Sequence, residues 1–239
     1  MEQLALKLRR WWGIDNYSPV DIFPLVLEEI ENLTLIWLDM DDAISGCCSQ
    51  NDDDSLIVIN SNHTKGRQNF TLAHELYHLK FDKSKEWSIC RKNSKNSVEL
   101  KANDFASHFL MPTCALEDYA DKRKIGQWQL KDIIRCEQFF QISHQSMLIR
   151  LRNERYIDQD QFENFEFGAR GVAASMGFDT ALYEKSPESR MNYVLGNLIP
   201  LVDDLYNQHL ISKGLRNEIL LKNYRADLVY NIKEDNGFD

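Results

Sequence analysis

Residues 70–79 read FTLAHELYHL and contain the pattern His-Glu-x-x-His. In a helix, residues four positions apart lie on the same face, one turn above each other. His74 and His78 can therefore direct two imidazoles at one cation, and neutral imidazole is a good ligand for zinc. Glu75, beside the first histidine, is placed to take a proton from the attacking water as general base, without being a ligand. The pattern predicts a metallopeptidase site on a helix over residues 67–81.

A catalytic zinc ion usually has three protein ligands and an open fourth position, so a third ligand is expected from a second helix. That helix is predicted over residues 97–110, where Glu99 is the favoured ligand. Asn103 follows one turn later and is suited to hydrogen-bond a ligating histidine and fix its tautomer. The alternative third ligands are His63, His108 and Glu86. His108 is disfavoured because it lies about 13 Å further along the helix axis than Glu99.

Short strands precede this helix pair, which predicts an α+β fold for the N-terminal part of the chain. The strands are expected at residues 34–38, 44–49 and 56–60, with a hairpin turn at 51–54. Helices are expected at 2–12 and from Ser18-Pro19 to about Glu31, where Pro24 indicates a kink or a late start. A polar connection is expected at 82–96. A strand directly before the metal-binding helix favours a peptidase, because a strand edge can hold an extended peptide.

Composition restricts the class of protein further. The 239 residues are 43% hydrophobic and carry a net charge of −9, which argues against a general nucleic-acid coat protein. Five cysteines without a CxxC pair predict reduced thiols in a cytoplasmic protein. No apolar stretch approaches the roughly 20 residues needed to cross a bilayer, so no membrane association is expected.

A basic segment lies in the middle of the chain. Residues 121–155 contain eight Lys or Arg against four Asp or Glu. Helices expected at 129–140 and 143–152 have the length and spacing of a helix-turn-helix, with His144, Gln145 and Ser146 at the start of the second. Arg150, Arg152 and Arg155 are therefore candidates for docking nucleic acid or a protein substrate. Protein docking is favoured, because the local excess of positive charge is small; DNA contact stays open as the alternative.

Taken together, HELYH at 74–78, ELKANDFA at 99–106 and LMP at 110–112 closely resemble the ImmA/IrrE family of metallopeptidases. The resemblance covers roughly residues 1–155. It implies a zincin-like core in which His74, His78 and Glu99 bind Zn²⁺ and Glu75 is the catalytic base. It also implies cleavage of a helix-turn-helix repressor, which releases genes of a mobile element or a stress response. Tyr77 departs from the family, which often has glycine there.

The predicted organisation is a zincin-like metallopeptidase domain (1–114), a helix-turn-helix-like segment (115–160) and an α-helical C-terminal region (161–239), with a linker at 158–167. The favoured function is an intracellular zinc endopeptidase acting on a repressor. One alternative is a regulatory protein that binds DNA or a repressor, with a structural or sensory metal. The other is a toxin-type protease of a toxin-antitoxin pair.

Overall fold

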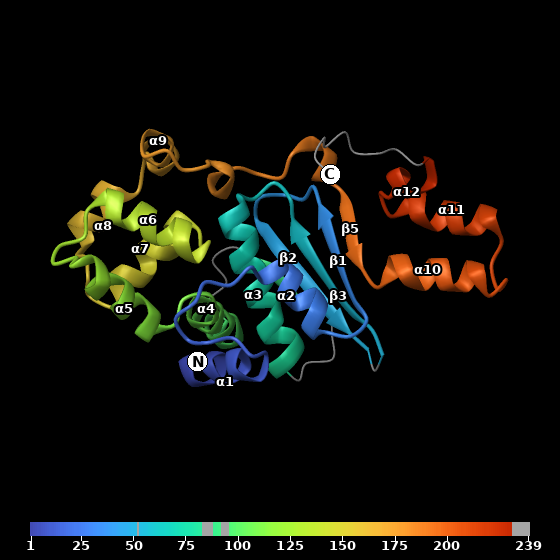
Figure 1. Cartoon of the computed structure of the whole chain (residues 1–239), viewed down its shortest axis with the longest axis horizontal. Coiled ribbons are helices and arrows are strands. Elements are labelled where there is room, and N and C mark those ends of the chain that lie inside the picture. Colours follow the sequence, from blue (N-terminus) through green and yellow to red (C-terminus); the bar gives the residue numbers. More distant parts are fainter. Residues whose placement is uncertain (52, 83–87, 92–95, 231–239) are drawn as a thin grey trace.

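The chain folds around a mixed β-sheet (Figure 1), and the computed structural model describes residues 1–51, 53–82, 88–91 and 96–230. Within this part of the chain the strand order is β4-β2-β3-β1-β5. β1 is parallel to β3 and antiparallel to β5, and β2 is antiparallel to β3 and β4. The strands are β1 (Leu33–Leu38), β2 (Ile44–Gln50), β3 (Ser55–Asn60), β4 (Ser88–Arg91) and β5 (Tyr193–Gly196). The predicted α+β class is confirmed.

The first three strands begin and end within one residue of their predicted limits. A hairpin joins β2 to β3: Asn51 Oδ1 accepts from the backbone N–H groups of Asp53 and Asp54, at 2.9 and 2.6 Å. Asp52, also part of the predicted turn, lies outside the described residues. The polar connection expected at 82–96 needs correction, because it contains β4. β4 is only four residues long and is defined by its pairing with β2, which local sequence does not indicate.

The helices of the N-terminal part pack on one another and on the sheet. α3 (Lys65–Phe81) packs on β2 and β3, α4 (Ser97–Leu110) packs on α3, and α1 (Glu2–Trp11) packs on α4. α2 (Ile22–Glu29) starts late, so that Pro24 falls in its first turn, where a missing N–H costs nothing. Phe105 of α4 is fully buried, with ring-centroid distances of 5.7 Å to Tyr77 and 5.4 Å to Phe81. Burial of such side chains contributes about 1.5–3 kcal/mol each and fixes α4 against α3.

A second group of helices follows α4. They are α5 (Thr113–Arg123), α6 (Leu130–Phe140), α7 (His144–Asn153), α8 (Gln159–Phe165) and α9 (Ala169–Ser175). α6 and α7 lie within one residue of their predicted limits. The linker predicted at 158–167 is wrong, because most of it forms α8. Asp158 and Gln161 make a reciprocal capping box that starts this helix, at 2.8 and 3.1 Å.

The C-terminal region is helical, as predicted, with α10 (Leu198–Asn207), α11 (Lys213–Lys222) and α12 (Ala226–Tyr230). It also supplies β5, which sequence analysis did not predict and which extends the sheet beside β1. Gly196 ends this strand with φ +91°, and a Cβ there would lie 2.1 Å from the Leu33 carbonyl oxygen. Among the described residues, no helix combines the length and the apolar character needed to cross a membrane.

Candidate metal centre

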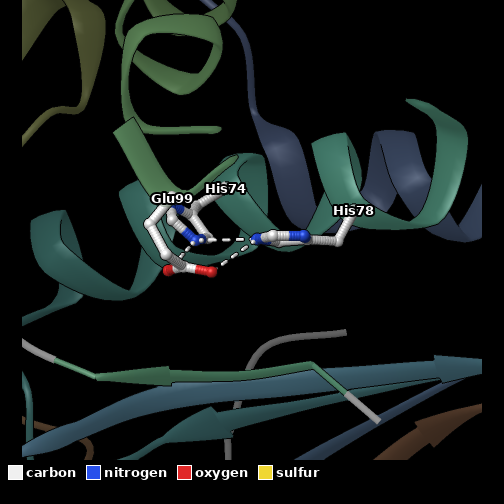
Figure 2. Close-up of side chains that lie close together, drawn as sticks. All are labelled: His74, His78 and Glu99. Atoms are coloured by element: carbon white, nitrogen blue, oxygen red, sulfur yellow. Dashed lines mark hydrogen bonds and ion pairs between the residues drawn. The ribbon is translucent and has the colours of Figure 1, made fainter. Parts of the chain in front are cut away.

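Three side chains from two helices converge between α3 and α4 (Figure 2). His74 Nε2 lies 3.2 Å from His78 Nε2 and 3.2 Å from Glu99 Oε2, and His78 Nε2 lies 3.3 Å from Glu99 Oε1. All three side chains are nearly buried, with exposed fractions of 6%, 5% and 9%. In the described part of the chain they are the one group of His, Cys, Asp or Glu donors close enough together to hold a metal ion. Two imidazoles and a carboxylate suit a divalent metal such as zinc.

The outer nitrogens of both imidazoles are held by oxygen acceptors. Asn103 Oδ1 lies 2.9 Å from His74 Nδ1, and Asp82 Oδ2 lies 3.0 Å from His78 Nδ1. Because a carboxylate or amide oxygen only accepts, each Nδ1 carries a proton. In its neutral form each imidazole therefore directs an Nε2 lone pair at the centre, where a metal ion would bind. The sequence predicts Asn103 in this role but not Asp82. The available signal was its position four residues after His78, at the end of the same helix.

Glu75 lies between α3 and the sheet and is fully buried. A Cβ on Gly46 of β2 would lie 3.3 Å from Glu75 Oε1, 2.8 Å from Thr71 Cγ2 and only 2.6 Å from the Val58 carbonyl oxygen. Glycine at position 46 therefore allows β2 to approach α3 closely at the point where the Glu75 carboxylate lies. No larger residue fits there without moving the backbone.

The centre is electrostatically coupled when it holds no metal. Hydrogen bonds from His74 and His78 lower the pKa of Glu99 strongly and outweigh its burial. Burial opposes protonation of His78, but its bonds to Glu99 and Asp82 outweigh this and raise the pKa of His78. Nearby, burial and the charge of Glu75 raise the pKa of the Cys47 thiol to about 11. The same causes raise the pKa of the Cys48 thiol still further. Neither thiol is a thiolate nucleophile at neutral pH.

The segment that carries this centre matches a known family. Residues 48–152 match the family model described as the IrrE N-terminal-like domain of peptidase family M78. This matched segment is similar to the metallopeptidase domain of that family. The match confirms the resemblance to the ImmA/IrrE family and indicates a metallopeptidase. None of the curated proteins compared with the chain matches it.

The M78 domain includes α3 and α4 but also α5, α6 and most of α7. A cavity of about 480 Å³ extends from the metal centre to α7. His74 and Glu99 line one part of it, and Gln145, Ser146 and Ile149 line another. The helix-turn-helix-like pair therefore borders the same cavity as the candidate ligands.

The alternative ligands do not join the centre. His63 Nε2 contacts Asp42 Oδ1 at 3.1 Å, and His108 Nδ1 lies 2.8 Å from the Asp104 carbonyl oxygen. Neither belongs to the three-residue donor group. Glu86 lies outside the described residues.

The predicted docking arginines do not form one surface. Arg150 is 3% exposed and donates to Ser107 Oγ at 3.0 Å, Thr113 Oγ1 at 2.8 Å and Glu154 Oε1 at 2.9 Å. Its prediction as a docking residue needs correction, because these bonds commit it to joining α7 to α4 and α5. Arg152 and Arg155 remain on the surface of the helix-turn-helix-like pair. Arg152 donates to Gln159 Oε1 at 3.0 Å.

His144 also differs from its predicted place at the exposed start of α7. Its Nδ1 lies 2.9 Å from Glu137 Oε2, and its Nε2 lies 2.7 Å from the Phe165 carbonyl oxygen. Glu137 is fully buried and also accepts from Tyr183 Oη at 2.6 Å. His144 therefore connects α6, α7 and the end of α8, and it is not available to read a base.

Proposed function

We propose that this chain is a zinc-dependent endopeptidase in which His74, His78 and Glu99 hold the ion. The observation that carries the proposal is the convergence of their Nε2 and carboxylate oxygen atoms within 3.2–3.3 Å. Three protein ligands leave a position open, which is the arrangement of catalytic zinc sites; structural sites usually have four. The adjoining cavity supports this, since substrate can reach His74 and Glu99 through it. When bound, zinc supplies Lewis-acid polarisation of the scissile carbonyl.

In this proposal Glu75 is the general base. It accepts a proton from the water whose oxygen attacks the scissile carbonyl carbon, and it returns that proton to the amine nitrogen as the C–N bond breaks. Its burial against Gly46 fixes the carboxylate in place, which lowers the cost of orienting it. Asn103 and Asp82 orient the two imidazoles and are positioning residues.

The proposed substrate is a helix-turn-helix repressor, whose cleavage would release genes of a mobile element or a stress response. This part of the proposal rests on the match to the IrrE N-terminal-like domain and on a cavity long enough to extend from the centre to α7. A cytoplasmic setting is supported by Cys47, Cys48, Cys114 and Cys136, which are free thiols.

The decisive experiment separates cutting from binding. The purified full chain is loaded with zinc and incubated with helix-turn-helix regulators encoded beside its gene, with and without a chelator, and the products are analysed by mass spectrometry. We expect one defined pair of fragments that disappears with chelator and returns when zinc is restored. Stable complex formation without any fragment would contradict the endopeptidase and favour a regulatory binding protein.

A further inference from the structure

The free face of α7 is directed into the cavity of the metal centre. Gln145, Ile149 and Asn153 are exposed residues spaced four apart, so they share one face of the helix. All three line the cavity that His74 and Glu99 also line. The opposite face of the helix, formed by Met147, Leu148 and Leu151, is buried in the core. The side of α7 that a DNA-binding protein would present to solvent is thus a wall of this cavity.

The turn before α7 is fixed to the metal-binding helix. A Cβ on Gly66 of α3 would lie 2.9 Å from Ser143 N and Cα, so the two backbones touch. Asn69 Nδ2, one turn later on α3, donates to the Gln141 carbonyl oxygen at 2.7 Å. On the other side, Arg150 bonds to α4 and α5. A recognition helix must project from the surface to enter a major groove, and these contacts hold α7 inside the fold.

The chemistry of the cavity suits a polypeptide better than a nucleic acid. Ile149 and Leu100 are large apolar side chains with exposed fractions of 38% and 55%, and both line it. Its lining contains three carboxylates, those of Glu99, Asp104 and Glu154, against the two guanidinium groups of Arg67 and Arg150. The cavity therefore offers phosphates no excess of positive charge. Arg150 is already paired with Glu154 at 2.9 Å. Amide, apolar and small hydroxyl groups are the contacts expected for an extended peptide.

We propose that α7 sets the sequence specificity of peptide cleavage, with Gln145, Ile149 and Asn153 contacting substrate side chains and Ile149 selecting an apolar one. This inference rests on the proposed peptidase function. It assigns the helix-turn-helix-like pair to substrate recognition within the M78 domain, in agreement with a family match that runs through residue 152. The α7 side chains contact the substrate away from the scissile bond and take no part in the chemical step.

The test compares cleavage preferences. The zinc-loaded full chain is incubated with a synthetic library of random dodecapeptides, and the cut peptides are sequenced by mass spectrometry. We expect an apolar preference at one substrate position. Ile149→Ala should weaken it about tenfold, in line with losing a few methylenes from an apolar pocket. Ile149→Glu should replace it by a preference for Lys or Arg at the same position. The matched control is Leu221→Ala on α11, which has a similar exposed fraction of 39% and lies outside the cavity.

Peptide binding can be measured without cleavage. A Glu75→Gln chain should retain library peptides with the same apolar preference. The double variant with Ile149→Glu should instead retain peptides with Lys or Arg at that position. Identical preferences in the wild type and both Ile149 variants would overturn this inference and leave the peptidase proposal standing. If the wild type cuts nothing and Glu75→Gln retains nothing, both proposals are wrong. Enrichment of one sequence from a random duplex DNA library, lost in Gln145→Ala, would instead assign α7 to DNA.

Discussion

α3 and α7 are both helices that sequence analysis selected for function, but they use their polar residues differently. In α3 every residue from Thr71 to Leu79 is buried, so the helix has no solvent face along the motif. In α7 one exposed stripe remains, and the buried polar residues, Arg150 above all, bond to neighbouring helices. In a helix buried all round, polar residues need a partner or a ligand. In α7 the buried Arg150 meets that need with side chains of its neighbours, so its polarity indicates structure. The polar residues of the exposed stripe, Gln145 and Asn153, line the cavity instead.

The largest expected effect tests the α3 side of this comparison. Glu75→Gln keeps the shape of the side chain but removes the proton acceptor, so cleavage should fall by about 10²–10⁴-fold with zinc content unchanged. Peptide turnover and metal analysis of the same preparation check it. Glu117→Gln, an exposed position on α5, is the matched control and should cut at the wild-type rate. A Glu75→Gln chain that still cuts at that rate would remove Glu75 from the mechanism.

The second largest expected effect concerns the oxygen acceptor that holds the His78 imidazole. Asp82→Ala removes the acceptor of His78 Nδ1–H, so the ring is free to rotate and to change tautomer. Zinc affinity should fall about 10–100-fold. Competition with a chromophoric chelator measures it, with the exposed Asp204→Ala on α10 as control. Unchanged affinity in Asp82→Ala would show that this carboxylate only ends the helix.

The third prediction compares the contributions of Arg150 and Arg152, two arginines of α7, to stability. Arg150→Met leaves Ser107, Thr113 and Glu154 without their donor, so it should lower the free energy of unfolding by about 1–3 kcal/mol. Arg152→Met loses one bond at the surface, to Gln159, and the contact of its guanidinium with the Phe162 ring at 4.6 Å, and should cost about 0.5–1 kcal/mol. Urea denaturation of both variants measures the difference. Equal losses of unfolding free energy would contradict the conclusion that Arg150 holds α7 to its neighbours while Arg152 does not.

The difference between α3 and α7 also explains which contacts could be predicted from the sequence and which could not. His74 and His78 are four residues apart on one helix, so helical geometry alone brings them together. Residues 97–110, expected to form the second helix, match α4 residue for residue. Three partners of Arg150 and His144 lie 37, 43 and 21 residues away, at Thr113, Ser107 and Phe165. No periodicity within α7 indicates such contacts. β5 was missed for a similar reason, since its partner β1 lies at the other end of the chain.

The smallest expected effect concerns the pH dependence that His144 gives to stability. Burial disfavours its charged form. The bond and ion pair with Glu137, the hydrogen bond to the Phe165 carbonyl and the charge of Glu166 outweigh this, so the pKa of His144 is raised in the folded chain. A group whose pKa is higher folded than unfolded stabilises the protein fully below its unfolded value, about 6.5. That stabilisation is lost as the pH rises through the folded pKa.

The gap in unfolding free energy between wild type and His144→Gln should therefore be widest near pH 6 and narrow towards pH 8. Titrating groups that do not contact His144 or Glu137, including the metal centre, are common to both proteins and cancel in this difference. Urea denaturation at a series of pH values measures it, with metal content held equal. A gap that stays constant across this range would show that His144 holds α6, α7 and α8 together as a neutral hydrogen-bonding group.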